Sequence, residues 1–83
     1  MSETIEVRVP PFGQSIDEAL IVTWLVAPGQ AITRGEPVVE VETAKATYEV
    51  PAEHDGVVES LLAAQGQIVD VGAPLYRLTV EPA

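Results

Sequence analysis

The stretch GQAITRGEPVVEV (residues 29–41) recurs 37 positions further along the chain as GQIVDVGAPLYRL (residues 66–78). Its two copies share the glycines, the glutamine and the proline. The apolar positions coincide as well: Leu25 with Leu62, Ile32 with Val69, Val38 with Leu75, Val39 with Tyr76, and Val41 with Leu78. A half-domain of this size cannot bury its apolar face alone, so we predict that two similar halves pack against each other about a pseudo-twofold axis.

The residues around the repeat favour short β-strands joined by turns. Residues 4–9 alternate between apolar and charged side chains, which is the period of a half-buried strand, and Pro10 ends this pattern. The expected strands cover residues 4–9, 20–26, 38–42, 47–50, 57–62 and 74–80, with shorter extended pieces at 31–33 and 67–70. No segment has the length and period of an amphipathic helix. Together with the repeat, this predicts a single all-β domain that folds as an antiparallel β-sandwich.

A sandwich of this kind has a definite core and definite turns. The residues expected in the core are Trp24, Leu25, Val39, Val41, Tyr76 and Leu78. The glycines expected to adopt positive φ in turns are Gly29, Gly35, Gly66 and Gly72. Their spacing does not form a phosphate-binding loop.

Composition and charge exclude several classes of protein. Thirteen acidic residues against four basic ones give a net charge of −9, which repels nucleic acid and anionic membrane surfaces. The chain has no cysteine and a single histidine, so disulfides, thiolate metal sites and histidine clusters are ruled out. Residues 19–27 form the longest uncharged apolar stretch, which is too short to span a bilayer, and the first ten residues resemble no signal or transit peptide. We therefore expect a cytoplasmic protein.

Lys45 is the only lysine in the chain, and it lies at the tip of the hairpin expected from residues 38–50. A lysine on a turn is in most proteins ordinary solubilising surface. Here the surface is otherwise rich in Glu and Asp, and the small neighbours Ala44 and Ala46 leave access for an enzyme. An acylated lysine side chain is a long neutral tether. The repeat also relates this hairpin tip to residues 80–83, which predicts that Lys45 and the C-terminus lie at opposite poles.

A catalytic site is not expected. His54 and Asp55 are adjacent on a predicted turn, where a base and the group that orients it do not face each other. No other constellation supplies a nucleophile with its base, and no cluster has the composition of a metal site. The chain by itself is therefore expected to be non-catalytic.

The residues around Lys45 resemble the attachment turn of lipoyl domains, which belong to the dihydrolipoamide acyltransferase component of 2-oxo acid dehydrogenase complexes. The resemblance lies in ETAKA (residues 42–46), EVPA (49–52) and DGV (55–57), and extends to VP (9–10), GQS (13–15), WL (24–25) and PGQ (28–30). It implies a flattened β-barrel of two four-stranded antiparallel sheets with pseudo-twofold symmetry, a barrel-sandwich hybrid. It also implies that lipoic acid is bound covalently to Lys45 as N6-lipoyl-lysine.

The resemblance assigns further roles near the lysine. Glu42, Ala44 and Ala46 are expected to be read by the modifying enzyme, a lipoyl ligase or lipoyl transferase. The family commonly has Asp where this chain has Ala44, which bears on recognition by that enzyme more than on attachment. The first loop, with Phe12, Gly13, Gln14 and Ser15, is expected to help partner enzymes select the domain.

The implied activity is that of an acyl carrier. A thiamin-diphosphate-dependent decarboxylase would load the arm, an acyltransferase catalytic domain would unload it, and a dihydrolipoyl dehydrogenase would reoxidise it. Residues 1–80 would form the carrier domain, and residues 81–83 a C-terminal tail or the start of a Pro/Ala-rich linker. Two alternatives remain: a biotin carrier domain of a carboxylase, whose lysine is typically flanked by methionines, and an unmodified interaction domain.

Overall fold

Every regular element that the structure describes is a β-strand. The structure is a computed structural model that describes residues 2–13 and 15–81. The strands are β1 (Glu3–Arg8), β2 (Glu18–Trp24), β3 (Ala31–Ile32), β4 (Pro37–Glu42), β5 (Thr47–Pro51), β6 (Gly56–Leu61), β7 (Ile68–Asp70) and β8 (Pro74–Val80). The strand expected at residues 20–26 lies at 18–24 instead. It begins earlier because Glu18 and Ala19 pair with β7, and it ends at Trp24, before the turn at Pro28 and Gly29.

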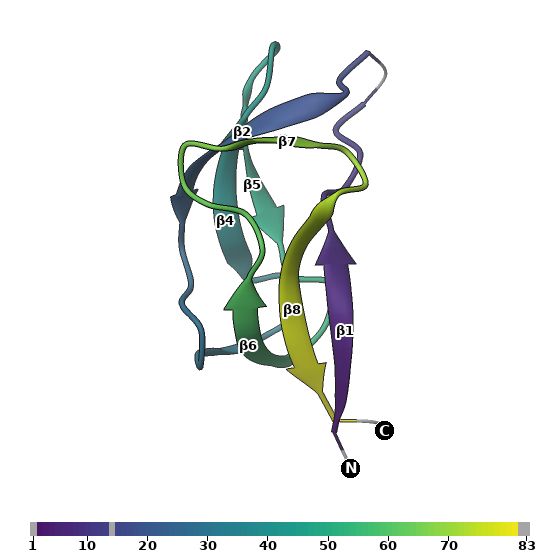
Figure 1. Ribbon diagram of the computed structural model, residues 1–83, viewed down its shortest axis with the longest axis vertical. Coiled ribbons are helices and arrows are strands. Elements are labelled where there is room, and N and C mark those ends of the chain that lie inside the picture. The colour runs from purple at the N-terminus through teal and green to yellow at the C-terminus, as the bar shows by residue number, and fades with distance from the viewer. Residues whose placement is uncertain (1, 14, 82–83) are drawn as a thin grey trace.

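The strands form two antiparallel sheets of four strands each (Figure 1). One sheet has the order β1-β8-β6-β3 and the other β5-β4-β2-β7. Exchanging β1 with β5, β2 with β6, β3 with β7 and β4 with β8 converts one order into the other. The predicted fold class, a sandwich of two four-stranded sheets related by a pseudo-twofold axis, is therefore confirmed.

The repeat is also present in the backbone hydrogen bonds. The Gly29 N–H donates to the carbonyl oxygen of Val58 at 2.7 Å, and the Gly66 N–H donates to that of Ile21 at 2.8 Å. The glutamines that follow these glycines cap their turns, because Gln30 Oε1 and Gln67 Oε1 each accept a hydrogen bond from the backbone N–H three residues earlier. The shared Gly-Gln pair thus forms the same turn hydrogen bonds once in each half.

The two halves differ in one connection. Val9, which follows β1, and Ala52, which follows β5, accept equivalent bonds from the Gly72 and Gly35 N–H groups, at 2.9 and 2.8 Å. These two residues are 43 positions apart, whereas the rest of the repeat has an offset of 37. The first half therefore has six more residues between Val9 and Ala19 than the second half has between the equivalent residues, Ala52 and Gly56. The loop between β1 and β2, which contains them, breaks the symmetry.

The core lies between the two sheets. Val39, Val41, Tyr76 and Leu78 are buried as predicted, and Trp24 packs against them with its indole N–H donating to the Ala63 carbonyl at 2.9 Å. Leu25 was wrongly predicted to be in the core, since its side chain is 41% exposed. A bulge in the β2–β4 pairing between residues 21 and 23 shifts the inward and outward alternation, and Leu25 then projects into solvent.

The four turn glycines confirm the prediction about backbone conformation. Gly29, Gly35, Gly66 and Gly72 have φ between 85° and 92°, the region that other residues enter only with strain.

The turn between β4 and β5 lies at one end of the long axis of the molecule. The start of β1 and the end of β8 lie at the other end (Figure 1), so the predicted opposition of the Lys45 hairpin and the C-terminal strand is confirmed.

Candidate functional site

The turn that carries Lys45 is held by one threonine. The Thr43 N–H donates to the Ala46 carbonyl at 2.8 Å, and the Thr43 hydroxyl donates to the same oxygen at 2.9 Å. Thr43 Oγ1 also accepts the backbone N–H groups of Lys45 and Ala46, at 3.3 and 3.2 Å. Sequence reasoning did not single out Thr43, although a hydroxyl residue at the first position of a tight turn is the signal that could have found it.

The side chain of Lys45 is free to carry a substituent. Lys45, Ala44 and Ala46 are all exposed, as the sequence predicted. Within residues 2–13 and 15–81, the Lys45 ammonium forms neither an ion pair nor a side-chain hydrogen bond; the ion pair that the structure does contain joins Arg8 to Glu6. A backbone fixed by Thr43 therefore presents an unshielded amine at the end of the molecule.

Glu42 is the last residue of β4, and it pairs with Thr47 of β5 and with Leu20 of β2. Its side chain is exposed. Together with Thr43 and Ala44 it forms one wall of a hollow of about 330 Å³. Glu42 and Ala44 thus line the same hollow, and both are accessible from solvent.

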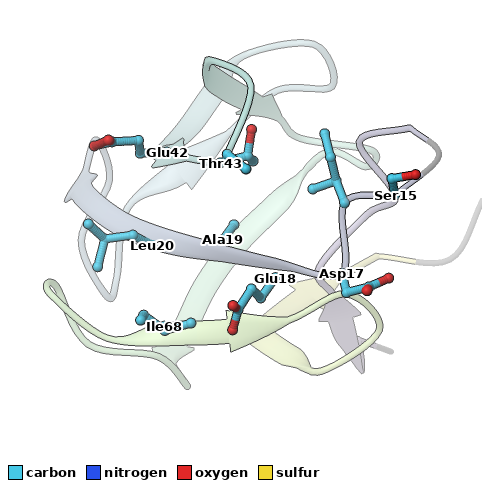
Figure 2. A pocket seen from close by; sticks show the side chains of 10 residues that line it. Ser15, Asp17, Glu18, Ala19, Leu20, Glu42, Thr43 and Ile68 are labelled. Carbon is cyan, nitrogen blue, oxygen red and sulfur yellow. The ribbon is translucent and has the colours of Figure 1, made fainter.

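The long first loop forms another wall of the same hollow. Ser15, Ile16 and Asp17 line it, and Figure 2 shows Ser15 and Asp17 beyond the Glu18 end of β2, with Glu42 and Thr43 farther along the same strand. Phe12 anchors the loop, because its ring stacks on that of Tyr48 in β5 with the centroids 5.3 Å apart. Gly13 and Ser15 both have positive φ, and Gln14 lies outside the described residues. The loop that breaks the symmetry therefore lies beside the lysine turn.

The remaining polar groups that the structure describes do not assemble a reactive site. Among the described residues, no three His, Cys, Asp or Glu side chains are grouped as a metal would require. Asp55 uses its carboxylate to accept the Arg34 backbone N–H at 2.7 Å, so it clamps the neighbouring loop. No helix in the described part of the chain is long and apolar enough to cross a membrane.

Comparison with known proteins places this geometry in a family. The biotin/lipoyl family, described as "Biotin-requiring enzyme", matches residues 5–78. The succinyltransferase component of the 2-oxoglutarate dehydrogenase complex of Staphylococcus saprophyticus is 45% identical over 67 residues, which is 81% of this chain and 16% of that protein. The lipoamide acyltransferase component of the branched-chain alpha-keto acid dehydrogenase complex of Bacillus subtilis is 35% identical over 78 residues, 94% of this chain and 18% of that protein.

A solved structure agrees in fold as well as in sequence. The lipoyl domain of the 2-oxoglutarate dehydrogenase complex from Azotobacter vinelandii matches with a TM-score of 0.71 and 38% identity, over 89% of this chain and 94% of that one. The chain spans less than a fifth of the length of the two acyltransferases described above. It belongs to the biotin/lipoyl family, and within that family it is a non-catalytic lipoyl domain of the type found in acyltransferase components of 2-oxo acid dehydrogenase complexes.

Proposed function

We propose that Lys45 carries lipoic acid in amide linkage, as N6-lipoyl-lysine, and that this chain moves acyl groups between the enzymes of a 2-oxo acid or acetoin dehydrogenase complex. The observation that carries the proposal is the position of the only lysine, exposed on a hydrogen-bonded turn at the pole opposite the start of β1 and the end of β8. Exposed alanines on both sides and the absence of an ion partner within the described residues fit an attachment site.

Bound to Lys45, lipoic acid would supply a dithiolane, a group that can accept an acyl group together with two electrons and pass both on to other enzymes. The protein supplies the anchor. Thr43 fixes the turn, so the arm starts from a defined point, while the exposed surroundings let it move. A tethered substrate meets successive sites at raised local concentration. The chain has no cysteine, so no protein thiol competes for the disulfide.

The proposed partners follow from the same role. They are a thiamin-diphosphate-dependent decarboxylase, an acyltransferase catalytic domain, a dihydrolipoyl dehydrogenase, and a lipoyl ligase or transferase. The first loop, with Phe12, Gly13, Gln14 and Ser15, is proposed to help partner enzymes select the domain, and the stacking of Phe12 on Tyr48 of β5 supports this role. Glu42, Ala44 and Ala46 are proposed to be read by the modifying enzyme.

Two further proposals concern the setting of the domain. Residues 1–80 form the carrier domain, and residues 81–83 a tail or the start of a linker to further domains. The much greater length of the related acyltransferases supports the linker. We propose a cytoplasmic location, where such a complex would draw on soluble 2-oxo acids and coenzyme A.

The test is the intact mass of the chain after incubation with a lipoyl ligase, lipoic acid and ATP. We expect one lipoyl increment on the wild type and none on Lys45→Arg, which keeps the positive charge. Because Lys45 is exposed, both proteins should unfold within about 0.5 kcal/mol of each other, so loss of the increment cannot be attributed to misfolding. An unmodified wild type, an increment that persists in the variant, or modification by a biotin ligase instead would contradict the proposal.

A further inference from the structure

An apolar strip lies on the outer face of the sheet that bears the lysine turn. It consists of the exposed side chains of Val22 in β2 and Ile68 in β7 and the half-buried side chain of Leu20 in β2. Leu20 and Ile68 are in register on neighbouring strands. Ile68 is 60% exposed and Val22 36% exposed. Leu20 and Ile68 also line the hollow that reaches Thr43 and Ala44 (Figure 2), so the strip continues to the residue that precedes Lys45.

The pseudo-twofold axis provides an internal control for this strip. On the other sheet, the positions related to Ile68, Val22 and Leu20 hold Ala31, Glu59 and Val57. The same strands in the same register therefore form with a small side chain and a carboxylate at two of the three positions. Since the fold does not require Ile68 and Val22, their exposure calls for a different explanation, and exposed apolar side chains that cluster commonly mark a binding surface.

Charges around the strip show the same asymmetry. Glu18 faces Asp70 across β2 and β7, and Glu40 faces Glu49 across β4 and β5. Like charges directly opposite each other on neighbouring strands are destabilising. On the other sheet, the pair related to Glu40 and Glu49 is Arg77 and Glu6, which attract each other. The lysine-bearing sheet thus keeps a pair of like charges at a position where the other sheet has a pair of opposite charges.

The charges define what can cover the strip. A second copy of this chain would bring acidic groups against acidic groups, and the negative rim repels phosphates. A protein surface with basic side chains around an apolar contact matches both the strip and its rim.

The length of the Lys45 side chain indicates which protein docks on the strip. An unmodified lysine has only a four-carbon stem, so an enzyme acting on its amine must lie against the surface beside the turn. Enzymes that meet the loaded arm can stand further away.

We propose that the outer face of β2 and β7, centred on Leu20, Val22 and Ile68, is the docking surface for the enzyme that attaches lipoic acid to Lys45. That enzyme presents basic side chains to the acidic rim and an apolar side chain to the strip. This inference rests on the proposed function, because it takes Lys45 as the modified residue.

The experiment measures kcat/KM for the unmodified chain as substrate of a lipoyl ligase, from the time course of the intact mass. Ile68→Ser removes the most exposed side chain of the strip without touching the turn. We expect it to lower kcat/KM about tenfold or more, the effect of losing one buried isoleucine at an interface. Val57→Ser, on the related face, exposes a similar side chain at 43% and should leave kcat/KM within about twofold.

A second pair of variants tests the rim. Asp70→Lys and Glu3→Lys change the net charge equally, and both side chains are exposed, but Glu3 lies near the opposite pole. We expect Asp70→Lys alone to lower kcat/KM, and the difference to shrink as ionic strength rises from about 0.05 to 0.5 M. Thermal unfolding of each variant shows that it is folded.

The outcomes separate this inference from the proposed function. A wild type that stays unmodified refutes both. Modification of all variants at the wild-type rate, or equal slowing by Ile68→Ser and Val57→Ser, overturns the docking surface and leaves Lys45 as the attachment site. A concentration-dependent dimer in sedimentation that Ile68→Ser abolishes would assign the strip to self-association and would also overturn the inference.

Discussion

Gly56 lies where two strands approach too closely for any other residue. A methyl group added to it would run into the backbone carbonyl oxygen of Thr79, and would lie 3.0 and 3.2 Å from two carbons of the Leu78 side chain. The oxygen cannot move alone, because Thr79 pairs with both β1 and β6. At the related position in the other half the chain has Ala19, buried without such a clash. We predict that Gly56→Ala shifts β6 against β8.

The expected loss of stability is large for a single methyl group. Overpacking costs about 1–3 kcal/mol, and displacement of a paired strand favours the upper end. For a domain of this size, about 3 kcal/mol lowers Tm by roughly 12–24 °C. That is a substantial part of a total stability on the order of 5–10 kcal/mol, yet the variant should still fold at low temperature.

Thermal unfolding followed by far-UV circular dichroism, with urea unfolding at 25 °C, measures the effect. The matched control is Gly66→Ala, where the added methyl group meets nothing within 4 Å but φ is 85°. Backbone strain alone should then lower stability by about 1–2 kcal/mol. If Gly56→Ala proves no less stable than Gly66→Ala, the steric argument is wrong.

Two other side chains give predictions of smaller size. The Tyr76 hydroxyl is buried without a hydrogen-bond partner in the described structure. Tyr76→Phe should therefore leave the free energy of unfolding unchanged at pH 7 or raise it by about 1 kcal/mol. A lower free energy of unfolding for the variant in urea would contradict this. Burial, and then the charge of Glu53, raises the pKa of Tyr76 in the folded protein above its ordinary 10.0. The stability that Tyr76 contributes through its ionisation is therefore complete below pH 10 and is lost as pH rises through the folded-state pKa. The wild type should lose more stability in alkali than Tyr76→Phe, and equal losses would refute this. Thr43→Val removes the hydroxyl that accepts the backbone N–H groups of Lys45 and Ala46. This change should lower the free energy of unfolding by about 1 kcal/mol, and it should lower the NMR order parameter of the Lys45 amide to about 0.6. Thr47→Val, at an exposed position outside the turn, should change neither quantity.

The features proposed to carry the function are those in which the two halves of the molecule differ. Equivalent strands, turns and backbone hydrogen bonds build both halves, so these features serve the fold. The six extra residues of the first loop, the Lys45 turn, the apolar strip and the acidic rim occur once, and they gather around one end of the lysine-bearing sheet. A pseudosymmetric domain thereby separates the features that stabilise it from those that we propose its partners contact.

Much of this architecture follows from local patterns in the chain. The alternation of apolar residues and the positions of Gly and Pro identify the strands and turns, because side chains on a strand alternate between two faces and few residues tolerate positive φ. The repeat predicts the sandwich and the two poles. Lys45 stands out because it is the only lysine and lies between strands. These are properties of sequence-local geometry, and the structure agrees with them.

Other features depend on contacts between residues far apart in the chain. The bulge that turns Leu25 outward arises from the pairing of β2 with β4, and no local pattern marks it. Thr43 acquires its role from the closure of the turn, and the stacking of Phe12 on Tyr48 brings a loop near the N-terminus to the middle of the chain. The apolar strip requires β2 and β7 to become neighbours, although 43 residues separate their ends. Sequence periodicity indicates which face of a strand a side chain occupies, but the pairing of distant strands decides where a bulge shifts that alternation and what each side chain meets.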